Sequence, residues 1–289
     1  MGLILPKISR RNLLKAGAGL FVPCAPAIIR PARAALTVNN LTGFSVVPPA
    51  AEGPTGIEFV GSAVIDSKAT TDYFIPLTGL TGGSDTQART GDVILVFYGL
   101  TAGGDATLSV DDTTLTWTET NESWYNDTYD LNIAHAWAYA DVAPPASVAI
   151  GHNSLTSAAG KFGIAYVFRG VDPTTPMDET PVAIGALSST TANPFSITPA
   201  TDGAAVVAFG AASQGATDWE FTAAPSGYDG FVSVNNAGTA PSTWRNLAAA
   251  AHKLNMSAGV SENPGAFTAS NTNADSAWGT YTIALRPAA

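Results

Sequence analysis

The chain repeats one β-rich pattern twice, and this repeat limits the folds that are open to it. An apolar run at 93–98 follows a Gly-Asp pair, and a similar run at 204–209 follows an Asp-Gly pair, 111 positions later. The strands predicted to close each half, which end at Arg169 and Arg286, correspond as well. Each half is long enough for one antiparallel sandwich. The sequence therefore predicts an all-β protein of two tandem antiparallel β-sandwich domains, jelly-roll-like or Ig-like.

Short apolar runs bounded by Gly, Asp, Asn and Pro recur in both halves, as expected of strands and turns. Runs that are apolar throughout, at 93–98, 164–168 and 204–209, predict strands buried on both sides. The stretch 131–139 alternates large and small side chains and is also expected to be a strand. Only 246–256 fits a helix as well as a strand, so the prediction remains all-β.

The domain boundaries follow from the same pattern. We expect a twin-arginine-like signal or anchoring arm at 1–34 and a Pro/Gly-rich linker at 35–56. The first β-sandwich is expected at 57–182 and the second at 183–289.

Charge is divided unevenly between the arm and the rest of the chain. Residues 1–34 contain six basic residues and no acidic one, which leaves seven basic and 23 acidic residues elsewhere. Such an acidic body repels nucleic-acid phosphates and anionic lipid headgroups, which are bound by Lys and Arg. We therefore expect no nucleic-acid partner.

The chain has one cysteine, Cys24, and it lies in the N-terminal arm. The body therefore has neither disulfides nor thiolate metal sites, and a large apolar core must stabilise it. No run of 18 apolar residues occurs, so no conventional membrane-spanning helix is expected.

The N-terminal arm carries the most specific motif of the sequence. Its string SRRNLLK, with the pair Arg10 and Arg11, resembles the twin-arginine export consensus. A short apolar stretch and the triplet Ala-Arg-Ala follow, so cleavage after Ala34 is expected if the protein is exported. The alternative is a basic arm that stays on the protein and anchors it to a larger assembly.

Several strings in the body resemble a tandem β-sandwich family found in phage-associated and bacterial surface proteins. They are GDVILVFYG, FRGVDPTTPMDE, DGAAVVAFGA and TIALRPA, and the resemblance covers nearly all of 57–289. Met177 stands where the family more often has Ile, a mild departure. The resemblance implies a non-enzymatic, surface-displayed role and transfers no functional residues.

Catalytic candidates are few, and each has a simpler structural interpretation. His135 and His252 lie in corresponding parts of the two halves, which favours packing over catalysis, and His152 stands alone. No His-x-His or HExxH pattern indicates zinc. The string at 211–215 resembles a nucleophile elbow but lacks its strand-to-helix context. We expect no catalytic residue, no metal and no cofactor.

The segment 117–130 (WTETNESWYNDTYD) is the best candidate for ligand contact. Aromatic faces beside Asn, Asp and Glu side chains suit sugar rings and their hydroxyls. The predicted glycan platform consists of Trp124, Tyr125, Tyr129, Asn126 and Asp127. Trp117 is instead expected in the core, because Tyr228 is its counterpart in the second half. The acids of this segment also suit Ca²⁺, although EF-hand spacing is absent.

Three functions fit these observations. The first is a structural or host-contact protein displayed on a phage-like particle, as a head decoration, spike or tail-associated protein at the virion surface. Its N-terminal arm would then be the anchor and other virion proteins its partners. The second is a twin-arginine-exported bacterial surface protein with a glycan-binding or adhesive role and cell-surface partners. The third is a secreted hydrolase. A homo-oligomer is compatible with each.

Overall fold

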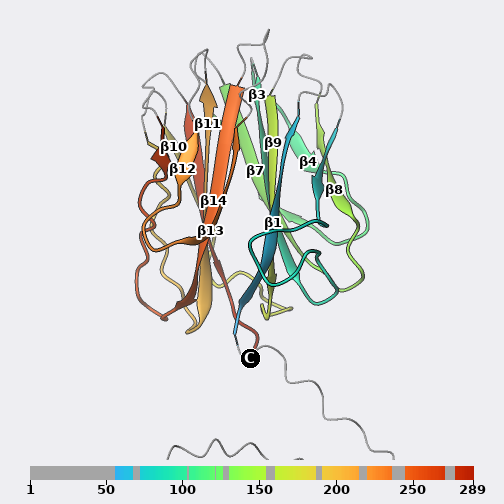
Figure 1. The fold of residues 1–289 in the computed structure, drawn as a ribbon, viewed down its shortest axis with the longest axis vertical. Coiled ribbons are helices and arrows are strands. Elements are labelled where there is room, and N and C mark those ends of the chain that lie inside the picture. Colours follow the sequence, from blue (N-terminus) through green and yellow to red (C-terminus); the bar gives the residue numbers. More distant parts are fainter. Residues whose placement is uncertain are drawn as a thin grey trace, which may run out of the picture. The chain divides into compact units, whose positions relative to one another are not determined.

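The described part of the chain consists of antiparallel strands joined by turns, arranged in two successive sets (Figure 1). The computed structural model describes residues 56–67, 72–102, 104–120, 122–125, 130–153, 160–186, 191–214, 220–235, 245–270 and 277–289. Within these ranges the side chains of residues 124, 184, 186, 214 and 245 are not described. The arm predicted at 1–34 lies outside the described residues, with Arg10, Arg11 and Ala34, and so do residues 35–55 of the linker predicted at 35–56.

The first set of strands forms a six-stranded and a three-stranded sheet. The large sheet has the order β1-β9-β3-β7-β5, with β6 also paired to β7, and the small sheet has the order β2-β8-β4. The strands are β1 (Glu58–Ser67), β2 (Tyr73–Pro76), β3 (Val93–Ala102), β4 (Leu108–Val110), β5 (Thr118–Glu119), β6 (Ser123–Tyr125), β7 (Asp130–Tyr139), β8 (Ser147–His152) and β9 (Gly160–Arg169).

The second set forms a five-stranded sheet, β10-β16-β11-β14-β13, and a two-stranded sheet, β12-β15. The strands are β10 (Val182–Ala186), β11 (Ala204–Gln214), β12 (Phe221–Ala223), β13 (Asp229–Asn235), β14 (Arg245–Met256), β15 (Thr268–Ala269) and β16 (Trp278–Leu285). Among the described residues, no helix is long and apolar enough to cross a membrane.

The two sets repeat one topology, which confirms the predicted all-β fold of two related sandwiches. In the large sheet of the first half, β9 lies between β1 and β3. In that of the second half, β16 lies between β10 and β11 in the same way. The stretch 246–256, which fitted a helix or a strand, is part of β14. Residues 246–252 are all buried, and successive side chains face the inner core and an outer core in turn, as only a strand allows.

The two large sheets pack face to face and share one apolar core. This inner core joins Phe97 and Ile164 of the first half to Phe209 and Ile283 of the second. There are also two outer cores, one in each half, and each lies between the large sheet and the small sheet of that half. The layers therefore run in the order three, six, five and two strands (Figure 1). All ten residues of β3 are buried as a result, which explains the continuous apolar run at 93–98.

The inner core shows how the two halves correspond residue by residue. The rings of Phe97 and Phe209 stack on each other, with centroids 4.6 Å apart and an interplanar angle of 4°. Leu95 and Val207 face the same core two positions earlier in their strands. The structural offset at β3 and β11 is therefore 112 and not 111. A shift of one residue matters here because it exchanges the two faces of a strand.

The strands of both large sheets end together at one end of the body. The register pairs Ser67 with Lys161 and Ala102 with Asp130 in the first half, and Gln214 with Arg245 in the second. We call this the loop end and define it by the strand termini that lie there, Ser67, Ala102, Asp130, Lys161, Gln214 and Arg245. Strand β1 begins at the opposite end of the body, and the C-terminus lies at that end as well (Figure 1).

The shared core predicts that both halves lose stability when it is disrupted. Replacing Phe209 by Ala should cost about 3–5 kcal/mol, the usual cost of a cavity at a buried Phe. Phe195→Ala is the control, since Phe195 is 53% exposed and should change stability by less than about 0.5 kcal/mol. Urea unfolding with amide exchange read in β3 and β11 measures both. Faster exchange in β11 alone would contradict a shared core.

Candidate functional site

Two histidine–tyrosine pairs cross the interface between the large sheets. His135 of β7 meets Tyr281 of β16 edge-on, with ring centroids 4.5 Å apart. His252 of β14 meets Tyr166 of β9 in a similar geometry at 6.0 Å. Each half thus supplies one histidine and one tyrosine to the inner core.

The tyrosine hydroxyls attach each half to the backbone of the other. Tyr166 donates to the carbonyl of Ala250 at 2.8 Å and also to that of Gly230. Tyr281 donates to the carbonyl of Ile133 at 3.2 Å. Because a buried hydroxyl is costly without a partner, these bonds also favour one register between the sheets.

Both histidines serve packing, as expected, although they are not equivalent. Their side chains are buried, and burial lowers the pKa of each to about 4, so both are neutral at pH 7. The expectation that they occupy corresponding places was inexact: His135 pairs with Phe97, whereas His252 pairs with Val207, the counterpart of Leu95. The third histidine, His152, ends β8.

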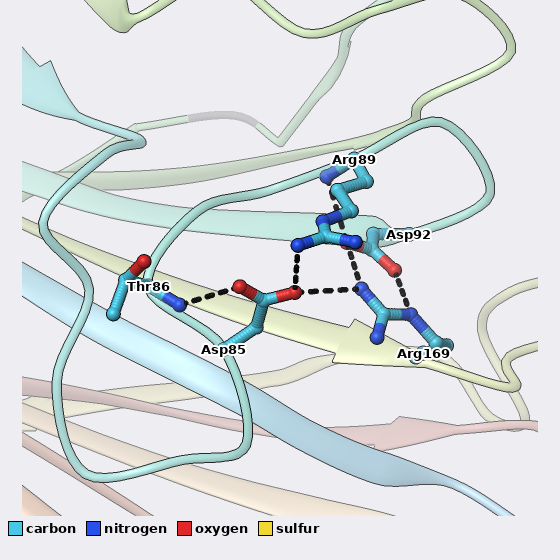
Figure 2. Close-up of polar contacts among 5 residues, drawn as sticks. All are labelled: Asp85, Thr86, Arg89, Asp92 and Arg169. Carbon is cyan, nitrogen blue, oxygen red and sulfur yellow. Dashed lines mark hydrogen bonds and ion pairs between the residues drawn. The ribbon is translucent and has the colours of Figure 1, made fainter.

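A charged cluster surrounds the Gly-Asp motif at the start of β3 (Figure 2). Asp92 is buried and accepts hydrogen bonds from Arg169 Nε and from the backbone N–H of Arg89, each at 2.8 Å. Asp85 binds Arg89 at 2.9 Å and lies 3.9 Å from Arg169. The Asp85 and Asp92 carboxylates hold neighbouring strands and turns together, so the Gly-Asp motif has a structural role in the fold.

The other motif residues join the connector between the halves to the end of the chain. Arg286 Nε donates to Asp178 at 3.2 Å, and Asp178 also accepts the backbone N–H groups of Ala200 and Thr201. Asp172 accepts the N–H groups that follow it in its turn. The strings FRGVDPTTPMDE and ALRP therefore stabilise the junction.

Residues 211–214 of the string that resembled a nucleophile elbow lie in β11, and residue 215 is outside the described residues. Ser213 is near the end of β11, fully buried, and its hydroxyl donates to the carbonyl of Ala277 at 3.3 Å. Because the strand continues through Gln214, the sharp turn that exposes a nucleophilic serine is not formed at Ser213.

The predicted glycan platform is described only in part. Tyr125 lies in β6, but Asn126, Asp127, Tyr129 and the side chain of Trp124 are outside the described residues. The Tyr125 ring packs against the backbone of Gly185 in β10 and Gly279 in β16, where it occupies the space of a side chain. At least this ring takes part in the interface between the halves.

Trp117 is a core-packing residue, as its counterpart suggested. It packs against the outer core of the first half, and Tyr228 is buried in the outer core of the second. Its indole N–H donates to Asp112 at 2.8 Å, and Asp112 also accepts backbone N–H groups of the turn that follows it.

The surface of the first half has a groove that the sequence did not single out. Two adjoining hollows, of about 480 and 330 Å³, share Thr118 and Trp137. We call them together the Trp137 groove. Its lining residues are Thr116, Thr118, Thr120, Trp137, Tyr139, Asp141, Pro173, Met177, Asp178, Glu179, Thr180 and Pro181. The available sequence signal was the Trp-x-Tyr alternation in 131–139, which has no aromatic-pair counterpart in β14.

Within the described ranges, no group of three or more His, Cys, Asp or Glu side chains is placed to hold a metal ion. Comparison with known proteins found no matching family model, no matching curated protein and no matching solved structure.

The two buried histidines predict a pH dependence of stability. Their ordinary pKa of 6.5 applies in the unfolded chain, which therefore binds protons at a higher pH than the folded protein. The unfolding free energy should be at its full value above pH 6.5 and fall as the pH drops toward 4, by up to about 3 kcal/mol per histidine. Urea unfolding from pH 4 to pH 7.5 measures this.

The control for this titration is the double variant His135→Gln, His252→Gln. It should show a much flatter dependence over the same range, whatever its absolute stability. An unchanged slope would mean that other groups carry the effect.

Proposed function

We propose that this is a non-enzymatic structural or host-contact protein displayed on the surface of a phage-like particle. Residues 1–34 are the anchor, other virion proteins are the partners at that end, and the loop end makes the outward contacts. The proposal draws on the acidic, cysteine-free body and on the resemblance of its motifs to tandem β-sandwich surface proteins. It also draws on the opposite positions of the start of β1 and the loop end.

The observation that carries the proposal is that β1 begins at one end of the body and the loop end lies at the other. Strand β1, which follows the arm and linker in sequence, begins with Glu58 at the end opposite to the loop end. A sandwich held at one end presents the connections at its other end, and such connections are where sandwich proteins commonly make contacts. An anchor before residue 57 would therefore leave the loop end free.

The chemistry of the described residues supports a structural role. The charges of the motifs are paired within the fold, as in Asp92–Arg169 and Asp178–Arg286. Both large-sheet histidines are buried against aromatic rings, which suits a packing role. Fold alone does not license a function, and the proposal rests on these residues.

The arm and body also differ in charge in a way that suits anchoring. The arm is purely basic, whereas the body is strongly acidic. The arm can therefore bind an acidic surface on the particle while the bodies of neighbouring copies repel one another.

Deleting residues 1–34 tests the anchor. The truncated protein should fold with an unchanged melting temperature, because the described core begins at residue 57, but it should no longer join the particle. Co-sedimentation with purified particles measures incorporation, and Arg10→Gln, Arg11→Gln in the full chain is the milder companion. Incorporation of the truncated protein at the normal level would refute the proposal.

The second candidate is an exported bacterial surface protein with a glycan-binding or adhesive role. The string SRRNLLK and the Ala-Arg-Ala triplet before residue 35 favour it. The intact mass of the protein from its native source separates the two. A chain that starts at Ala35 supports export, and a mass near 29.5 kDa supports a retained anchor.

A further inference from the structure

We propose that the Trp137 groove is a binding site for a neutral saccharide. The site lies on the side of the first half, beside the connector, and is distinct from both the arm and the loop end. The inference goes beyond the proposed display function and does not require the arm.

The floor of the groove is aromatic. Trp137 and Tyr139 stand two residues apart on β7, so their side chains point to the same face and are about 7 Å apart along the strand. Both rings pack against the inner core on one side and remain partly exposed on the other. Rigid, half-exposed aromatic rings are well suited to stack against the C–H faces of sugar rings.

The rim of the groove is polar and offers hydrogen bonds to hydroxyl groups. Exposed Thr116 and Thr118 line one side, from the edge strand β5 and the turn before it. Exposed Glu179 and Thr180 line the other side, and Asp141 lies at one end. Hydroxyl groups both donate and accept, and carboxylates accept, which matches the hydroxyls of a sugar.

The charge of the lining selects against acidic sugars. None of the described lining residues is Lys or Arg, whereas Asp141 and Glu179 are acidic. Recognition of a carboxylate or a sulfate normally uses Arg or Lys. We therefore assign the groove to neutral sugars.

The second half shows that the repeat does not require this groove. His252 stands in register with Trp137, and there the ring of Phe59 fills the space, 4.2 Å from His252. In the first half the connector contributes Met177, Glu179 and Thr180 beside Trp137 instead of an aromatic ring. The open groove is thus a feature added to one half of a repeated framework.

Binding of the full chain to neutral oligosaccharides tests the proposal. The probes are cellohexaose, maltohexaose and chitohexaose, with polysialic acid as the acidic comparison, all measured by titration calorimetry. We expect binding to at least one neutral probe and none to polysialic acid. The variant Thr118→Arg, at an exposed position, should fill the groove and weaken binding about tenfold or more.

Two further variants make the test specific. Trp137→Ala should weaken binding similarly, while its melting temperature reports any loss of core packing. Thr90→Arg, in a separate hollow of about 360 Å³ on the same half, should leave binding unchanged. Absence of binding to all three neutral probes, or equal binding by Thr118→Arg and the unaltered chain, would overturn the proposal. Deletion of residues 1–34 should not affect this binding, so the anchor and the groove are tested separately.

Discussion

The face-to-face packing of the two large sheets is the interaction on which the rest of the structure depends. The Phe97–Phe209 stack lies within this inner core, and the two histidine–tyrosine pairs cross the same interface. The packing covers the second face of strands that already pack against a small sheet. It therefore makes one cooperative body from two repeated halves, and it places both histidines where they are neutral and inaccessible.

This packing also limits where function can reside. Among the described residues, the inner core and the two outer cores contain many large aromatic and aliphatic side chains, and the motif charges are paired at the junctions. Among the described residues, the two proposals rest on different surfaces: the loop end, and the Trp137 groove on the side of the first half. The first is the basis of the proposed display function, and the second is the basis of the proposed saccharide site.

The sequence indicated the position of framework residues better than that of residues near the surface. It predicted that Trp117 packs in the core, because Tyr228 is its counterpart in the second half. Equivalent positions of two related sandwiches pack in the same way. It could not anticipate that Tyr125 packs on Gly185 and Gly279, because those glycines lie in the other half. It did not single out Trp137, because the groove forms only when the edge strand and the connector, which are distant from Trp137 in sequence, come together beside it.

The sequence by itself determined the all-β class, the repeat and the strands, because apolar runs and turn residues act locally along the chain. It also determined the contrast between a basic arm and an acidic body, which depends only on composition. The tertiary structure alone decided that the two sandwiches share a core, that the repeat is offset by 112 at its centre, and that Trp137 borders an open groove. These features depend on which faces of distant strands meet, and the order of residues in each strand does not specify its partner.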